Sequence, residues 1–200
     1  MLDYKFEDNK SETTFVLFHG TGGSKEDLIP LAKMIDESAN ILSFEGDVNE
    51  GGMKRFFKRK APGVFDEDDL IERTHQLKNT LEKIINAKNL NKNHLVGLGY
   101  SNGANILGSL LYHYESPFKQ IFLHHPMMPY KNKTPLNQKG LKAFIGAGKN
   151  DPICPTEETF GVAKALRNQE VIVDIHWHES GHQLTQSELD AAKAYYVKNA

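Results

Sequence analysis

Short apolar runs alternate with longer amphipathic segments along almost the whole chain. The apolar runs lie at residues 13–20, 40–44, 93–99, 119–125, 141–148 and 171–178. They are continuously apolar, which is typical of parallel strands buried on both faces. This alternation predicts an α/β fold with a doubly wound, mostly parallel sheet and helices on both faces. The chain has 200 residues, so we expect residues 1–200 to form a single domain.

The segments between these runs have helical periodicity. We expect helices over residues 24–38, 66–89, 156–168 and 185–198, and another that begins just after Ser101. Ser24 and Asp66 stand where helix N-caps are expected. Residues 2–7 could add an edge strand. Because ligand sites in such sheets lie beyond the carboxyl ends of the strands, the loops that follow the strands should carry the chemistry.

One such loop contains the sequence Gly99-Tyr100-Ser101-Asn102-Gly103. This G-x-S-x-G spacing, between an apolar run and a helical pattern, is typical of a nucleophile elbow. A turn this sharp strains the backbone at the serine, and a side chain at either glycine would collide with the neighbouring strand or helix. The spacing alone fits a nucleophile at Ser101 and an ordinary glycine-rich turn with a capping serine equally well, so the rest of the chain must decide between them.

An acid and a base follow two later strands. Asp151 lies after residues 141–148 and His182 after residues 171–178, so the chain order is Ser101, Asp151, His182. This is the order of an α/β-hydrolase triad, in which the histidine takes the serine proton and the carboxylate orients the imidazole. We expect Asp151 to raise the pKa of His182. Backbone N–H groups of Thr21 and Asn102 are the expected oxyanion donors.

Several segments resemble the phospholipase/carboxylesterase family of α/β-hydrolases, which includes acyl-protein thioesterases. They are FHGTGG, GYSNGAN, HHPMMP, GKNDPICP and SGHQL. The tract GDVNEGGMKRFFKR, followed by GVFDEDDL, is similar to a bacterial carboxylesterase branch that includes a methylhydroquinone-resistance hydrolase. The resemblance spans residues 14–185 and implies the same roles for the triad and the two donors. Thioesterase relatives often carry HGLGD where this chain has HGTGG.

These observations predict a serine hydrolase that cleaves carboxylic esters through an acyl-enzyme. Two alternatives stay open at this point. The same triad could act as a thioesterase or a dienelactone-type hydrolase, or the fold could serve as a binding module without turnover. The expected partner is a small-molecule ester or thioester, and a homodimer is implied only by the resemblance.

Residues 45–65 form the longest connection without a clear pattern, and long connections often act as lids. The basic stretch at residues 54–60 can be read as a solvated turn, or as a cap in which Phe56 or Phe57 lines the substrate pocket. Histidines at 124, 125, 176 and 178 suggest a metal site only weakly, so we expect no metal and no cofactor. His19 is expected to brace the oxyanion turn, and Cys154 to serve in packing.

Composition and charge narrow the function classes. The net charge is −2, which gives no general attraction to nucleic acid or to an anionic membrane. No apolar run reaches the length of a membrane span, and the first ten residues do not resemble a signal peptide. With one cysteine, no internal disulfide is possible. We therefore expect a cytoplasmic protein.

Overall fold

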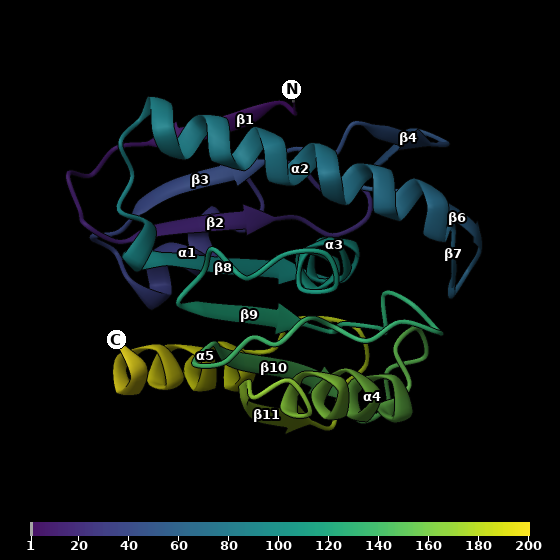
Figure 1. Ribbon diagram of the computed structural model, residues 1–200. Coiled ribbons are helices and arrows are strands. Elements are labelled where there is room, and N and C mark those ends of the chain that lie inside the picture. The colour runs from purple at the N-terminus through teal and green to yellow at the C-terminus, as the bar shows by residue number, and fades with distance from the viewer. Residues whose placement is uncertain (1) are drawn as a thin grey trace.

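The computed structural model describes residues 2–200 and contains a central seven-stranded sheet (Figure 1). The strand order is β1-β3-β2-β8-β9-β10-β11. The strands are β1 (Tyr4–Glu7), β2 (Thr14–Phe18), β3 (Asn40–Phe44), β8 (Leu95–Tyr100), β9 (Gln120–His124), β10 (Lys142–Gly148) and β11 (Ile172–His178). Strand β1 runs antiparallel to β3, and the other neighbouring strands are parallel. The predicted fold class is confirmed, including the edge strand.

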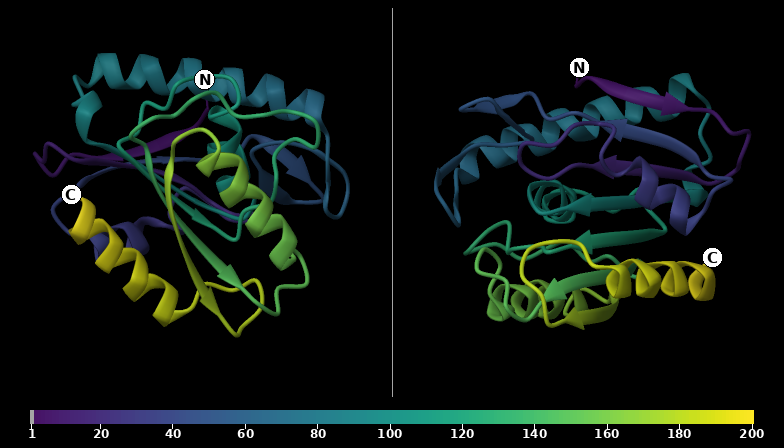
Figure 2. Two further views of the ribbon diagram at one scale, coloured as in Figure 1. Left: turned by 60° about the horizontal axis from the view of Figure 1, so that its bottom comes forward. Right: turned by 180° about the vertical axis from the view of Figure 1, so that it is seen from behind.

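Helices cover both faces of this sheet (Figure 2). They are α1 (Ile29–Ile35), α2 (Glu67–Ala87), α3 (Asn102–Leu110), α4 (Thr156–Arg167) and α5 (Gln186–Asn199), with a short 3₁₀ turn η1 (Lys92–His94). Helices α1 and α5 pack on one face, and α2, α3 and α4 pack on the other. Within residues 2–200, no helix is both long and apolar enough to cross a membrane.

Strand β2 shows why the apolar runs are continuous. Phe15 and Leu17 enter the core under α1 and α5, whereas Val16 and Phe18 enter the core under α2 and α3. Successive side chains of a strand point to opposite faces, so a strand covered on both faces needs apolar residues at every position.

The helix predicted over residues 24–38 is much shorter in the structure. Helix α1 begins at Ile29, and its N-cap residue Leu28 makes no side-chain capping bond. Pro30 explains the late start, because proline lacks an N–H and is accepted only in the first turn of a helix. Ser24 instead donates its hydroxyl to Asp27 Oδ1 at 2.7 Å. The predicted cap at Asp66 of α2 is present.

The connection at residues 45–65 is also more regular than the sequence suggested. It forms two small antiparallel pairs, β4 (Val48–Glu50) with β5 (Met53–Arg55), and β6 (Arg59–Ala61) with β7 (Val64–Phe65). Gly51 and Gly52 have φ values of +60° and +89° at the first turn, and Gly63 has +72° at the second. Such left-handed positions in tight hairpin turns favour glycine. Both pairs lie at the carboxyl end of the sheet (Figure 1).

Candidate active site

A cavity of about 270 Å³ lies at the carboxyl ends of the strands. Its wall combines the loops after β2, β8 and β10, the loop after β11, and both hairpins of residues 45–65. The lining residues are Thr21, Met53, Arg55, Arg59, Gly63, Phe65, Tyr100, Ser101, Asn102, Asn105, Met127, Ile153, Cys154 and His182. The topology therefore brings residues from most of the chain to one pocket.

Ser101 stands at the turn between β8 and α3 with φ 53° and ψ −115°. A non-glycine residue in this region is strained, and such strain is characteristic of functional sites. The two flanking glycines are needed for space. A Cβ on Gly99 would lie 2.6 Å from Gly103 O, and a Cβ on Gly103 would lie 1.9 Å from Phe18 O. The elbow thus packs α3 directly against the backbone of β2 and β8.

Ser101, His182 and Asp151 form one hydrogen-bonded chain. Ser101 Oγ lies 2.8 Å from His182 Nε2, and His182 Nδ1 lies 2.7 Å from Asp151 Oδ2. A carboxylate only accepts hydrogen bonds, so the proton of a neutral His182 is on Nδ1 and Nε2 is free to accept from the serine. Asp151 Oδ1 accepts from the backbone N–H groups of Ile153 and Cys154 at 2.8 and 2.9 Å. These donors hold the carboxylate ionised and fixed.

The pKa of His182 departs from the expectation. Burial disfavours the imidazolium and lowers the pKa of His182 below 6.5, although the hydrogen bond and charge of Asp151 act in the opposite direction. Asp151 does act to raise this pKa, as expected, but the sequence contained no sign that burial would outweigh it. Tyr100 supports the same loop, because its hydroxyl donates to His182 O at 2.7 Å. Nothing in the sequence marked Tyr100 for this contact.

The predicted oxyanion donors lie on the same pocket as Ser101. The N–H of Asn102 belongs to the first residue of α3, and the helix's first backbone bond runs from Asn105 N to Ser101 O. N–H groups at a helix start point out of the helix and favour negative charge. The loop that carries Thr21 is held by a bond from Gly22 N to Lys54 O at 2.9 Å.

His19 holds the loop that carries Thr21 in place, as expected. Its Nδ1 lies 2.6 Å from Gly20 O, and its Nε2 accepts from Gly46 N at 3.0 Å. The second contact requires an unprotonated Nε2, so His19 is neutral with its proton on Nδ1. Burial lowers the pKa of His19, which agrees with this tautomer.

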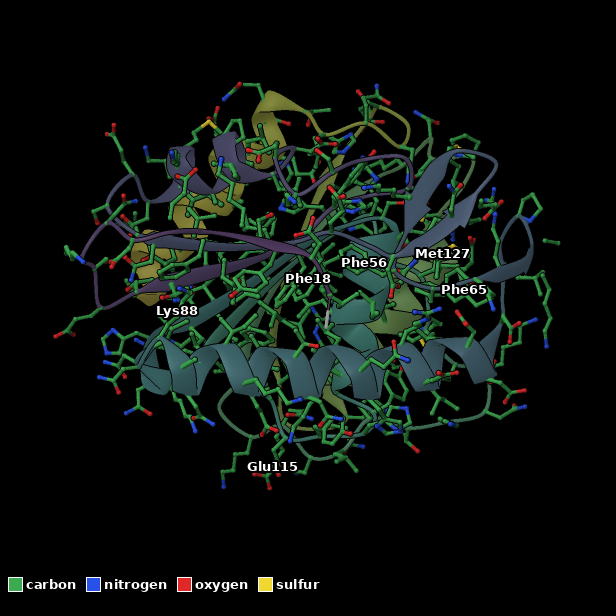
Figure 3. The ribbon with its side chains drawn as sticks, turned by 90° about the horizontal axis from the view of Figure 1, so that it is seen from above. Phe18, Phe56, Phe65, Lys88, Glu115 and Met127 are labelled. Carbon is green, nitrogen blue, oxygen red and sulfur yellow. The ribbon has the colours of Figure 1, made fainter. Side chains whose placement is uncertain are left out.

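Phe56 and Phe57 do not line the pocket. Their exposed fractions are 1% and 0%, and both belong to the core under α2 and α3. In Figure 3, Phe56 lies in the interior near Phe18, whereas Phe65 and Met127 lie further toward the start of α2. The pocket phenylalanine is Phe65, because the second hairpin folds back over the site.

Two arginines from the basic stretch reach the pocket instead. Arg55 is buried and its Nη1 donates to Thr21 Oγ1 at 2.8 Å, while its Nε lies 3.3 Å from Glu50 Oε2. Arg59 Nη2 donates to Glu50 Oε1 at 2.7 Å. Sequence reasoning treated these cations as a solvated or capping surface. Only the hairpin register reveals that two guanidinium groups share one carboxylate at the pocket wall.

A second histidine–carboxylate cluster lies behind the triad residues. Glu188 of α5 is fully buried and is surrounded by His124, His125 and His178. His125, His178 and Glu188 each offer one atom that could ligate a metal ion, and these three atoms lie within 4.8 Å of one another. Glu188 accepts hydrogen bonds from His124 Nδ1 and His125 Nε2, whereas His124 Nε2 and His178 Nε2 are buried without a hydrogen-bond partner among the described residues. His176, which the sequence grouped with these histidines, lies elsewhere and contacts Ser187.

Cys154 lies between the two clusters. It is buried, its N–H donates to Asp151 Oδ1, and its Sγ donates to His125 O at 3.2 Å. Burial raises the pKa of the Cys154 thiol well above its usual range. A thiol in this environment is a poor nucleophile, which agrees with the expected packing role.

Comparisons with known proteins show what this chain is similar to. It is 43% identical over 195 residues to the protein named "Putative hydrolase MhqD" of Bacillus subtilis (strain 168), with 98% of each chain covered. No family model matches the chain. Among solved structures, a carboxylesterase of Bacillus cereus superposes with a TM-score of 0.97 at 44% identity, covering 100% of this chain and 95% of that one. YahD, in a structure with malic acid, gives 0.93 at 29% identity with full coverage of both chains.

The fold, the site and these relatives agree. Relatives of such identity over nearly the whole length share one fold and one broad chemistry with this chain. The chain belongs to the MhqD-type carboxylesterases of the phospholipase/carboxylesterase family, which are hydrolases with the α/β-hydrolase fold.

Proposed function

We propose that the protein hydrolyses carboxylic esters through an acyl-enzyme on Ser101. The observation that carries this proposal is the unbroken chain from Ser101 Oγ through His182 to Asp151, with contacts of 2.8 and 2.7 Å. A serine hydroxyl is a weak nucleophile until a base takes its proton, and a neutral imidazole in this position is such a base.

In the first half of the reaction, Ser101 Oγ attacks the ester carbonyl carbon while its proton passes to His182 Nε2. The negative charge on the tetrahedral intermediate falls on the former carbonyl oxygen, which accepts hydrogen bonds from the N–H groups of Thr21 and Asn102. His182 then gives its proton to the departing alcohol oxygen as the ester bond breaks. The acyl group stays on Ser101.

In the second half, a water molecule replaces the alcohol. His182 takes a proton from the water as the oxygen attacks the acyl carbon, and then returns it to Ser101 Oγ as the acyl bond breaks. The carboxylic acid leaves and the free serine is restored. Asp151 stabilises the His182 imidazolium in both halves.

The test of this proposal combines labelling with turnover. A fluorophosphonate probe should label the wild-type protein at Ser101, and a series of nitrophenyl esters of increasing acyl length should be hydrolysed. The Ser101→Ala variant should do neither, because alanine keeps the elbow but removes the nucleophile. Ser109→Ala is the matched control: Ser109 is a buried serine on α3 that contacts Thr74 and Tyr130. Labelling at another residue, or equal turnover by Ser101→Ala, would contradict the proposal.

The charge of the pocket indicates which kind of ester the protein prefers. Arg55 and Arg59 line the cavity, and the lining residues include neither aspartate nor glutamate. Glu50 neutralises one of the two guanidinium charges. Guanidinium groups recognise carboxylates with paired hydrogen bonds. The similar protein YahD has a solved structure with malic acid, which is a dicarboxylic acid. We therefore propose a small ester that carries a carboxylate as the preferred substrate.

A pair of esters tests this preference. Nitrophenyl acetate is neutral, whereas the mono-nitrophenyl ester of succinic acid has a similar reactive group and a free carboxylate. Arg59→Gln should raise KM for the anionic ester about tenfold and leave the neutral ester nearly unchanged, since one charged hydrogen bond is lost. Lys60→Gln removes a neighbouring exposed cation that is absent from the lining and serves as the control. Equal effects of Arg59→Gln on both esters would count against an anionic substrate.

A further inference from the structure

The Asp151 carboxylate has a second histidine partner. His125 Nδ1 lies 2.8 Å from Asp151 Oδ2, the same oxygen that His182 Nδ1 contacts at 2.7 Å. His125 Nε2 lies 3.4 Å from Glu188 Oε2 on α5. When Asp151 and Glu188 are ionised, their carboxylates can accept hydrogen bonds but cannot donate them. Both ring nitrogens of His125 must therefore donate, which makes this ring an imidazolium held between two buried carboxylates.

The surroundings of Glu188 fix its charge. Its Oε1 accepts from His124 Nδ1 at 2.5 Å, and His178 Nε2 lies 3.2 Å from its Oε2. His178 Nδ1 accepts from Ser180 N at 3.2 Å, so His178 is neutral. Burial alone would raise the pKa of Glu188, but the hydrogen bonds of His124 and His125 outweigh it and lower this pKa. Glu188 is thus an ionised carboxylate with no exposed surface, and it needs a cation beside it.

His125 is that cation. Burial would lower the pKa of His125, but contacts with Glu188 and Asp151 outweigh burial and raise it. Its ring centre lies 5.1 Å from that of His182, 5.4 Å from that of His178 and 5.8 Å from that of Tyr100. The positive charge therefore lies close to the ring of the proposed base.

The backbone of His125 is held in a costly conformation. Its φ is +53°, in the left-handed region that non-glycine residues uncommonly adopt, although histidine is among those found there most often. Its N–H donates to Gly146 O at 2.8 Å, and its carbonyl accepts from Cys154 Sγ. Strain of this kind persists only where the surroundings over-determine it. His125 follows the last residue of β9, and its ring contacts Asp151 without lining the pocket.

We propose that His125, held as an imidazolium between Asp151 and Glu188, is a positioning residue that fixes the Asp151 carboxylate and keeps His182 neutral to a lower pH. It does so in two ways. A second donor on Oδ2 limits the rotation of the carboxylate, and a nearby positive charge disfavours a second positive charge on His182. The role in turnover rests on the proposed function, but the charge of His125 does not.

The variant His125→Asn separates charge from shape. Asparagine is the non-glycine residue best suited to a left-handed φ, and its side-chain amide can donate to Asp151 as Nδ1–H does. The variant loses the positive charge and the hydrogen bond to Glu188. The acid limb of the kcat/KM profile should move to higher pH, so that the ratio of kcat/KM at pH 6 to that at pH 8 falls about fivefold. A merely structural role would lower kcat/KM equally at both pH values.

The control is His113→Asn, which alters a half-buried histidine bonded to Tyr130 and remote from the triad. It should leave the acid limb in place. A folded His125→Asn protein with the wild-type acid limb would overturn the proposal.

Nuclear magnetic resonance of the wild-type protein gives a reading that needs neither folding of the variant nor turnover. The ring nitrogens of His125 should both carry protons at pH 7, while those of His182 show a neutral ring with the proton on Nδ1. A neutral His125 at pH 7 would overturn the proposal. If instead His125 is doubly protonated but no ester is hydrolysed, the proposed function fails and the charge assignment stands.

Discussion

Two histidine–carboxylate clusters lie side by side in this molecule, and they differ in what the histidine nitrogens face. In the first, His182 gives one nitrogen to Asp151 and presents the other to a serine hydroxyl at the pocket. In the second, His125 gives both nitrogens to carboxylates. The side chain of His182 is 17% exposed, whereas those of His125 and Glu188 are 0% exposed. A histidine can act as a base only where one nitrogen is left without a proton.

The largest expected difference between the two clusters appears when each carboxylate is neutralised in turn. Asp151→Asn should lower kcat by about 10⁴, because an amide no longer holds His182 in the tautomer that leaves Nε2 free. Glu188→Gln should lower kcat far less, since Glu188 does not contact His182. Steady-state kinetics on one nitrophenyl ester measures both. Asp174→Asn, at an exposed position of β11, is the control. Similar losses from the two carboxylates would mean that the clusters act as one unit.

The next largest effect concerns the backbone N–H groups of Thr21 and Asn102. These proposed oxyanion donors lie beside the first cluster only. Thr21→Pro deletes an N–H and should lower kcat by about 10²–10³. Thr21→Ala and Asn102→Ala keep their N–H groups and should cost about tenfold at most. They do lose side-chain bonds, from Arg55 Nη1 to Thr21 and from Phe56 N to Asn102.

Thr21→Ser keeps both the hydroxyl and the N–H and serves as the matched control. Circular dichroism must show that the proline variant is folded. A loss of 10² or more in folded Asn102→Ala would mean that the Asn102 side chain, and not its N–H, works in the site.

Much of the first cluster was predictable from the sequence. Ser101, Asp151 and His182 each follow a predicted parallel strand, and such strands end at one edge of a sheet. Local spacing around Ser101 then identified the elbow. The turn that we propose as the oxyanion turn was predicted in the same way, from a loop after a strand. These predictions needed only the order of elements and a short motif.

The second cluster was predictable only in part: the sequence grouped His124, His125 and His178, but their carboxylate partner depends on which strands and helices become neighbours. His125 lies 26 residues from Asp151 and 63 from Glu188, and no motif joins them. Glu188 is the third residue of α5, where an acid is ordinarily explained by the helix dipole. Only the burial of that turn against Gly146 of β10 reveals its partners. A Cβ on Gly146 would lie 1.8 Å from Glu188 Oε1, so the glycine makes room for the carboxylate.

The second cluster should matter more for stability than for activity. Removing one partner of a buried ion pair is costly, so Glu188→Gln should lower the free energy of unfolding at pH 7 by about 3 kcal/mol. The folded pKa of Glu188 is lowered, so its contribution is present above the unfolded value of about 4.3 and is lost as pH falls. The difference between wild type and variant should therefore shrink in acid.

Urea titrations at pH 7 and at pH 3 measure both free energies. Glu179→Gln is the control, because Glu179 forms only an exposed ion pair with Lys149. A Glu188→Gln protein as stable as wild type at pH 7 would show that this carboxylate needs no charge, and the second cluster would then be neutral.

The smallest effect is expected at the residue that joins the clusters. Cys154 contributes its N–H to Asp151 and its thiol to His125 O, and a backbone N–H is kept by any residue except proline. Cys154→Ala therefore removes only a weak sulfur hydrogen bond and some packing, and should change kcat/KM by about threefold or less. Native protein treated with iodoacetamide should keep its activity, because burial raises the pKa of this thiol and blocks access to it. Rapid inactivation that Cys154→Ala abolishes would mean that the reagent reaches this buried thiol through the pocket that Cys154 lines, and the expected packing role would then be wrong.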